Sequence, residues 1–144
     1  MISLICKKYG IENYIINSDG SIDVNGNVYL SYKGLTELPL TFNKVTGYFN
    51  CGYNNLTSLK GCPRWVGSWF SYFNNQLTSL EFSPYYVGGY LDCRYNLLTD
   101  NYCDTEIGGW FYTTLDQDGL TNDNYNEWRK MYKRKLILND IFNM

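Results

Sequence analysis

The 144-residue sequence contains no histidine. Catalytic triads of the Ser-His-Asp type and histidine-based metal sites are therefore excluded. The sequence also has no apolar run near the ~20 residues that cross a bilayer, which predicts that no membrane is a partner. The N-terminal segment MISLICKKYG places its lysines after the apolar residues, the reverse of a secretory signal peptide. We therefore expect a cytoplasmic protein.

Charge is scarce and unevenly divided, with a net value of −2 at pH 7. Residues 1–123 carry 7 basic and 12 acidic side chains, a net charge of −5, whereas residues 124–144 carry 5 basic and 2 acidic side chains, a net charge of +3. An acidic body repels phosphates, so nucleic acid is disfavoured as a partner.

The remaining residues predict no catalytic residue, no metal site and no cofactor. The five cysteines are an odd number and lack the C-x-x-C spacing of zinc sites. Asp116, Asp118 and Gly119 suggest a calcium loop, but the EF-hand register puts Thr114 where the first aspartate belongs. We interpret this segment as a turn and expect a protein without enzymatic activity.

What the sequence does contain is a repeat. The segments Val45–Trp65 and Val66–Tyr86 are each 21 residues long and share the pattern V-x-x-x-F-x-[CY]-x-x-N-x-L-T-S-L-x-x-x-P. The same register extends back to Val24 and forward to Val87, and a final half copy begins at Ile107. Roughly four repeats and a fragment are enough for a stable solenoid.

These residues resemble the leucine-rich repeat family. The run F-x-C-x-x-N-x-L-x-x-L is similar to that repeat, and LTELPLTFNKV is similar to the short L-x-x-L-P repeats of bacterial secreted effectors. The segments VGGYLDCRYN and NNQLTSL resemble those of small repeat proteins encoded by bacteriophages. The resemblance covers residues 24–112. It implies a leucine-rich-repeat solenoid with one parallel β-sheet of about four to five short strands, and it implies binding of another protein.

We expect one domain over residues 1–144, in three parts. Residues 1–23 form an N-terminal cap made of a helix and a hairpin, because the first repeat would otherwise expose its apolar edge. Residues 24–112 hold the leucine-rich repeats. Residues 113–144 form a C-terminal cap helix, whose apolar face closes the last repeat and comprises Tyr125, Trp128, Tyr132 and Leu136.

Alternation along each predicted strand separates inward from outward positions. Positions five and seven of each repeat are apolar and point inward. The asparagines at position ten, Asn54, Asn75 and Asn96, follow where the chain leaves the strand, and their amides can satisfy freed backbone groups there.

Positions four, six and eight then point outward, and many of them are aromatic. Exposed apolar patches mark interaction sites, and Trp, Tyr and Arg are enriched at binding hot spots. Tyrosines at position nine, Tyr32, Tyr53 and Tyr95, add to the same face. The alternative is that cross-strand stacking only stabilises the sheet. The predicted partner-binding residues are Tyr29, Tyr48, Asn50, Trp69, Phe73, Tyr90, Asp92, Arg94, Trp110 and Tyr112.

Three functions stay open at this point. The first is a non-enzymatic protein-binding module, in its concrete form a phage-encoded inhibitor or modulator of a host defence or housekeeping protein in the host cytoplasm. The second is a structural protein that forms homo-oligomers through the same face. The third is a sponge for nucleotide ligands that stack on the aromatic rings.

Overall fold

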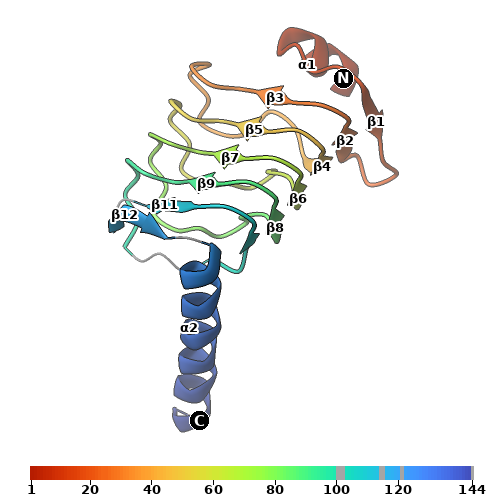
Figure 1. Ribbon diagram of the computed structural model, residues 1–144. Helices are drawn as coiled ribbons and strands as arrows, with labels where there is room; N and C mark the ends of the chain where they lie inside the picture. Colours follow the sequence, from red (N-terminus) through yellow and green to blue (C-terminus); the bar gives the residue numbers. More distant parts are fainter. Residues whose placement is uncertain (100–102, 114–115, 121, 144) are drawn as a thin grey trace.

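The computed structural model describes residues 1–99, 103–113, 116–120 and 122–143. The chain forms a β-solenoid of about four turns, in which each 21-residue repeat makes one turn (Figure 1). The two chain ends lie at opposite ends of the stack of turns (Figure 1).

Two six-stranded sheets run along the solenoid. In the first sheet all neighbours are parallel except the antiparallel pair β1–β2, and the strands are β1 (Tyr14–Ile16), β2 (Ile22–Val24), β4 (Phe42–Val45), β6 (Trp65–Val66), β8 (Tyr86–Val87) and β10 (Glu106–Ile107). In the second sheet all neighbours are parallel except the antiparallel pair β11–β12, and the strands are β3 (Val28–Tyr29), β5 (Phe49–Asn50), β7 (Phe70–Ser71), β9 (Leu91–Asp92), β11 (Phe111–Thr113) and β12 (Asp116–Leu120).

We predicted one parallel sheet of four to five strands, whereas the structure has two sheets of six strands each, so the prediction is wrong in the number of sheets and of strands. The first sheet forms because the residues on either side of each repeat boundary are also extended and pair with the turn before, as Trp65 does with Lys44. A bend then separates the two strands of each turn, and glycines let neighbouring turns approach there. A Cβ atom on Gly67 or Gly88 would lie only 2.3 Å from a backbone oxygen of the preceding turn, so a larger residue does not fit.

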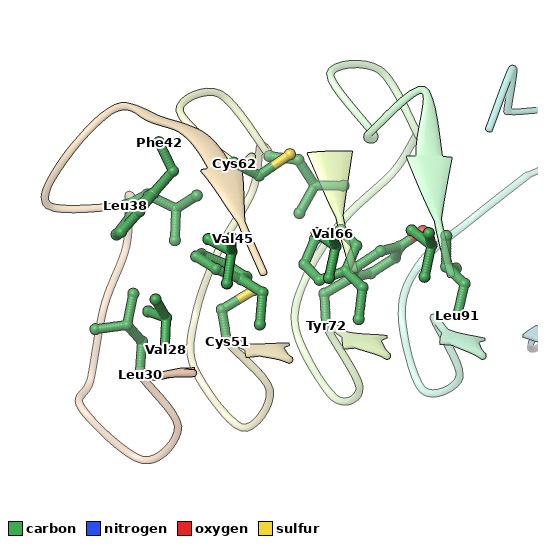
Figure 2. Packing of buried hydrophobic residues seen from close by; sticks show 14 of the residues in the cluster. Val28, Leu30, Leu38, Phe42, Val45, Cys51, Cys62, Val66, Tyr72 and Leu91 are labelled. Carbon is green, nitrogen blue, oxygen red and sulfur yellow. The ribbon is translucent and has the colours of Figure 1, made fainter. Parts of the chain in front are cut away.

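The core fills the space between the two sheets and the return path (Figure 2). Burial confirms the predicted inward positions. The residues at positions five and seven are all fully buried: Val28, Leu30, Phe49, Cys51, Phe70, Tyr72, Leu91 and Cys93. Leucines at positions twelve and fifteen are buried behind them: Leu56, Leu59, Leu77 and Leu80.

The N-terminal end agrees with its prediction. Helix α1 (Ile2–Lys8) is followed by the β1–β2 hairpin, which adds β1 to the edge of the first sheet. Cys6 and Ile11 are buried against the first turn, and Ile5 packs partly against it. The segment therefore covers apolar surface that the first repeat would expose.

The C-terminal helix α2 (Asn122–Phe142) differs from its prediction. The segment before it is a strand, β12, because it pairs with β11. Tyr125 of α2 is fully buried and Arg129 lies 3.9 Å from Asp104, whereas Leu136 is exposed and the helix projects from the last turn (Figure 1). The side chains of Trp128 and Tyr132, also predicted to close the last repeat, lie outside the described residues. Within the described residues, the helix therefore covers the last turn near its start, at Tyr125, and leaves Leu136 exposed.

Candidate functional site

The outward face of the second sheet carries a stack of aromatic rings at position four. The Tyr48 and Trp69 ring centroids lie 4.3 Å apart with planes 10° from parallel, and those of Trp69 and Tyr90 lie 5.4 Å apart at 3°. Parallel pairing of β5, β7 and β9 places these residues on consecutive rungs. We call Tyr48, Trp69 and Tyr90 the first aromatic stack.

A second aromatic stack runs beside it, where the chain leaves the strands. Tyr32 and Tyr53 have ring centroids 4.5 Å apart, Tyr53 and Phe73 are 5.3 Å apart, and Phe73 and Tyr95 are 4.9 Å apart. The three tyrosines have φ between 53° and 58°, a left-handed conformation that turns each side chain out of the strand alternation. Tyr32, Tyr53, Phe73 and Tyr95 form the second aromatic stack.

A row of polar side chains at position six lies between the two stacks. Asn50 Oδ1 accepts hydrogen bonds from Ser31 Oγ at 2.7 Å and from the Gly52 amide at 3.0 Å. Ser71 and Asp92, on the next two rungs, are buried although they belong to the outward face. The aromatic rings therefore shield the position-six row, which becomes a polar floor.

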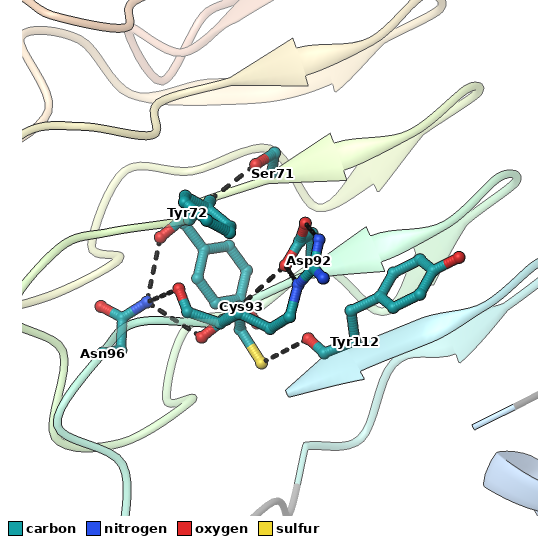
Figure 3. Close-up of polar contacts among 8 residues, drawn as sticks. Ser71, Tyr72, Asp92, Cys93, Asn96 and Tyr112 are labelled. Carbon is teal, nitrogen blue, oxygen red and sulfur yellow. Dashed lines mark hydrogen bonds and ion pairs between the residues drawn. The ribbon is translucent and has the colours of Figure 1, made fainter. Parts of the chain in front are cut away.

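Arg94 is fixed in place at one end of this floor, next to Asp92 and Tyr112, which Figure 3 shows. Its Nε and Nη2 atoms donate to the two carboxylate oxygens of Asp92 at 3.0 and 2.8 Å. Its guanidinium carbon lies 5.4 Å from the Phe73 ring centroid and 4.8 Å from that of Tyr112, so aromatic rings flank the cation. The hydrogen bond to Asp92 raises the pKa of Arg94 above its usual value.

The structure brings most of the predicted site together. Tyr90 contacts Tyr112 edge-on at 6.0 Å, and Trp110 stacks on Tyr112 at 6.3 Å, which continues the aromatic surface to β11. Tyr29 lies on the edge strand β3 and is exposed. The second aromatic stack enlarges the site beyond the predicted ten residues, and the recurrence of tyrosine at position nine was its signal in the sequence.

One further aromatic column lies outside the face that the repeat pattern predicts. On the outer side of the first sheet, the Trp65 and Tyr86 rings stack with centroids 5.3 Å apart, and Lys44 Nζ lies 4.9 Å from the Trp65 centroid. In the repeat pattern, Trp65 and Tyr86 occupy a variable position directly before the valine that opens the next copy. Without the first sheet, nothing places them on a common face.

The cysteines offer no exposed nucleophile. All five are free and buried. Burial raises the pKa of the Cys51, Cys62, Cys93 and Cys103 thiols, so that the reactive thiolate is disfavoured. Among the described residues, no group of three or more Cys, Asp or Glu side chains is placed to hold a metal ion.

Comparisons of the chain with protein-family models, with curated protein sequences and with solved structures find no match. Within the described part of the chain, no helix has the length and apolar character needed to cross a membrane.

Proposed function

We propose that the aromatic face of the second sheet binds another protein without catalysis. The observation that carries this proposal is the pair of aromatic stacks that flank the polar floor of Asn50, Ser71 and Asp92. Large rings with few rotatable bonds lose little entropy on binding, and a hydrogen-bonding row beneath them supplies orientation. Arg94 adds a cation whose position is already set by Asp92, so it can bind a carboxylate or carbonyl at small entropic cost.

The stacking also bears on the nucleotide alternative. In the first aromatic stack, each face of Trp69 is covered by a neighbouring tyrosine, with ring planes within 10° of parallel. A base would have to separate these rings before it could stack on them. Ring edges and hydroxyl groups remain for a ligand, and these suit the carbonyls, amides and aromatic edges of a protein surface.

The concrete form of the proposal follows from the sequence resemblance. Small phage-encoded repeat proteins and secreted effectors with similar repeats support an inhibitor or modulator of a host protein, acting in the host cytoplasm. Homo-oligomerisation through the same face is the second candidate, because a self-complementary aromatic surface could also cover its own copy. Light scattering behind a sizing column, at several protein concentrations, separates the two candidates.

The test of the proposal is the substitution Trp69→Ala. A hot-spot truncation costs at least ~2 kcal/mol of binding free energy, so we expect the affinity for the partner to fall at least ~30-fold. The partner is first identified by capture from a bacterial lysate on the immobilised protein, and its dissociation constant is then measured for each variant. Circular dichroism establishes that the variant retains the fold.

Trp65→Ala is the matched control, because it removes the same side chain from the first sheet. It should leave the affinity for that partner unchanged. Unchanged affinity of Trp69→Ala, or equal losses for both variants, would contradict the assignment of the binding face.

A further inference from the structure

The first sheet carries a different surface, with two neighbouring cavities that share Tyr85. The smaller is about 170 Å³ and is lined also by Asn43, Lys44 and Trp65. The larger is about 470 Å³, a size within the ~300–1,000 Å³ range of ligand pockets, and Arg64 is among its lining residues. The Arg64 amide donates to the Asn43 carbonyl at 2.9 Å and the Tyr85 amide donates to the Arg64 carbonyl at 3.0 Å, so the three residues occupy consecutive rungs.

These cavities concentrate positive charge on an acidic body. Lys44, Lys60 and Arg64 line them and are three of the 7 basic residues in residues 1–123, whereas no carboxylate lines either cavity. No described acidic group forms a salt bridge with any of the three cations. Asp23 pairs with Lys44 across the sheet, and its Oδ1 accepts hydrogen bonds from Asn43 at 2.8 Å and Asn17 at 3.0 Å. Glu81 and Asp104 line a separate cavity that shares Phe82, Ser83 and Tyr85 with the larger one. The site therefore favours an anion.

The same cavities offer an exposed aromatic side chain beside the cations. Trp65 is flanked by Lys44 and Tyr86 on its two sides. Tyr85, by contrast, is 60% exposed and lies at both cavities. A planar group stacked on Tyr85 would hold an attached phosphate next to Arg64 on the adjacent rung, about 4.8 Å away.

Phe82 lies at the rim of the larger cavity and has a strained backbone conformation. It has φ of 70°, and the equivalent residue of the preceding turn is Gly61, with φ of 92°. Like Tyr32, Tyr53 and Tyr95 of the second aromatic stack, Phe82 is an aromatic residue in a costly left-handed conformation, and such strain concentrates at functional sites. The Phe82 carbonyl accepts a hydrogen bond from Cys62 Sγ at 2.7 Å, and its ring is 52% exposed. The turn thus keeps an exposed ring where glycine would be unstrained.

From these observations we infer that the first sheet binds a mononucleotide. The base stacks on Tyr85 and against Phe82, and the phosphate is held by Arg64 and Lys60, since the guanidinium group can bind phosphate oxygens in pairs. Lys44 lies on the other side of Tyr85 and extends the cationic surface. This site is on a different sheet from the aromatic stacks and does not depend on the proposed protein binding.

Isothermal titration of the full chain with AMP, adenosine and inorganic phosphate tests the inference. We expect AMP to bind at least ~10-fold more tightly than either part alone, since base and phosphate use separate groups. Arg64→Gln should weaken AMP binding about 10-fold, the effect of losing a charged hydrogen bond. Lys33→Gln, an equal charge change at an exposed site in the turn after β3, should leave AMP binding unchanged.

The variant Phe82→Gly distinguishes a role of Phe82 in binding AMP from a role in stabilising the fold. It removes both the exposed ring and the strain, so it should weaken AMP binding while raising the melting temperature. A lower melting temperature with unchanged AMP binding would assign Phe82 to the fold. AMP binding that is absent, that is insensitive to both Arg64→Gln and Phe82→Gly, or that is matched by phosphate or adenosine alone would overturn the inference.

Discussion

At the scale of single residues, the asparagine ladder joins neighbouring turns. Asn75 Nδ2 donates to the Cys51 carbonyl of the turn before and to the Tyr72 carbonyl of its own turn, both at 3.1 Å. Its Oδ1 accepts from the Leu56 amide at 2.9 Å. One amide thus satisfies three backbone groups that the left-handed bend frees from the sheet, as the sequence predicted.

We therefore expect Asn75→Ala to be strongly destabilising. It leaves three buried backbone groups without partners, and each such group costs ~1–3 kcal/mol. The free energy of unfolding should fall by at least about 2 kcal/mol, measured by urea denaturation followed by circular dichroism. Asn55→Ala changes an exposed amide in the preceding turn and should stay within about 0.5 kcal/mol of the parent. Equal midpoints for the two variants would contradict the role of the ladder.

Other residue-scale features were not accessible from the sequence. Inward positions could be assigned because two aligned copies expose the alternation. The strained backbone at Phe82 could not be predicted, because an aromatic residue does not indicate a left-handed conformation. The only indication is that Phe82 aligns with Gly61 of the preceding repeat. The pairing of Arg94 with Asp92 and the position of Arg94 between Phe73 and Tyr112 could not be predicted either, because both depend on the side-chain conformations that neighbouring strands impose.

At the scale of elements, the second-sheet strands were predictable and the first sheet was not. The second-sheet strands of the repeats begin at the fixed apolar position five, and the fixed apolar position seven follows each strand directly. The strands of the first sheet instead begin at variable residues such as Trp65 and Tyr86. Their extended conformation comes from pairing between turns, which a local pattern does not encode.

Helix α2 gives the prediction at this scale. Its first turn is fixed by Tyr125, whose hydroxyl donates to the Cys103 carbonyl at 2.8 Å and whose ring lies 4.6 Å from that of Phe111. Residues 136–143 are exposed. Deleting residues 136–144 should therefore change the free energy of unfolding by no more than about 0.5 kcal/mol. Tyr125→Ala should cost ~3–5 kcal/mol, as removal of a buried aromatic side chain does.

Thermal unfolding of the two variants, with a sedimentation check for aggregation, measures the difference. Aggregation or a large loss of stability on deletion would show that the distal half of α2 covers apolar surface.

At the scale of the whole molecule, the buried thiols set the response to alkaline pH. Burial raises the pKa of the Cys51, Cys62, Cys93 and Cys103 thiols above the usual ~8.5–9, so the folded state keeps these protons when the unfolded chain releases them. Unfolding then releases protons, and stability falls as the pH rises above about 9. Each thiol contributes up to about 1.4 kcal/mol per pH unit.

Urea denaturation at pH 7, 9 and 10 should show this loss. Cys51→Ala serves as the comparison, because it removes one of the four thiols and should flatten the slope between pH 9 and 10 by up to about 1.4 kcal/mol per pH unit. Stability that is constant from pH 7 to pH 10 would mean that these thiols ionise equally in both states.

The stacking of turns has a mechanical consequence. Hydrogen bonds between turns run along the solenoid axis, from the Val28 amide to the Tyr48 carbonyl and from the Phe49 amide to the Trp69 carbonyl. Tension between the chain ends would load these bonds one turn at a time. Each 21-residue turn that peels away would extend from about 4.8 Å along the solenoid axis to about 70 Å of stretched chain, so the protein would lengthen in discrete steps.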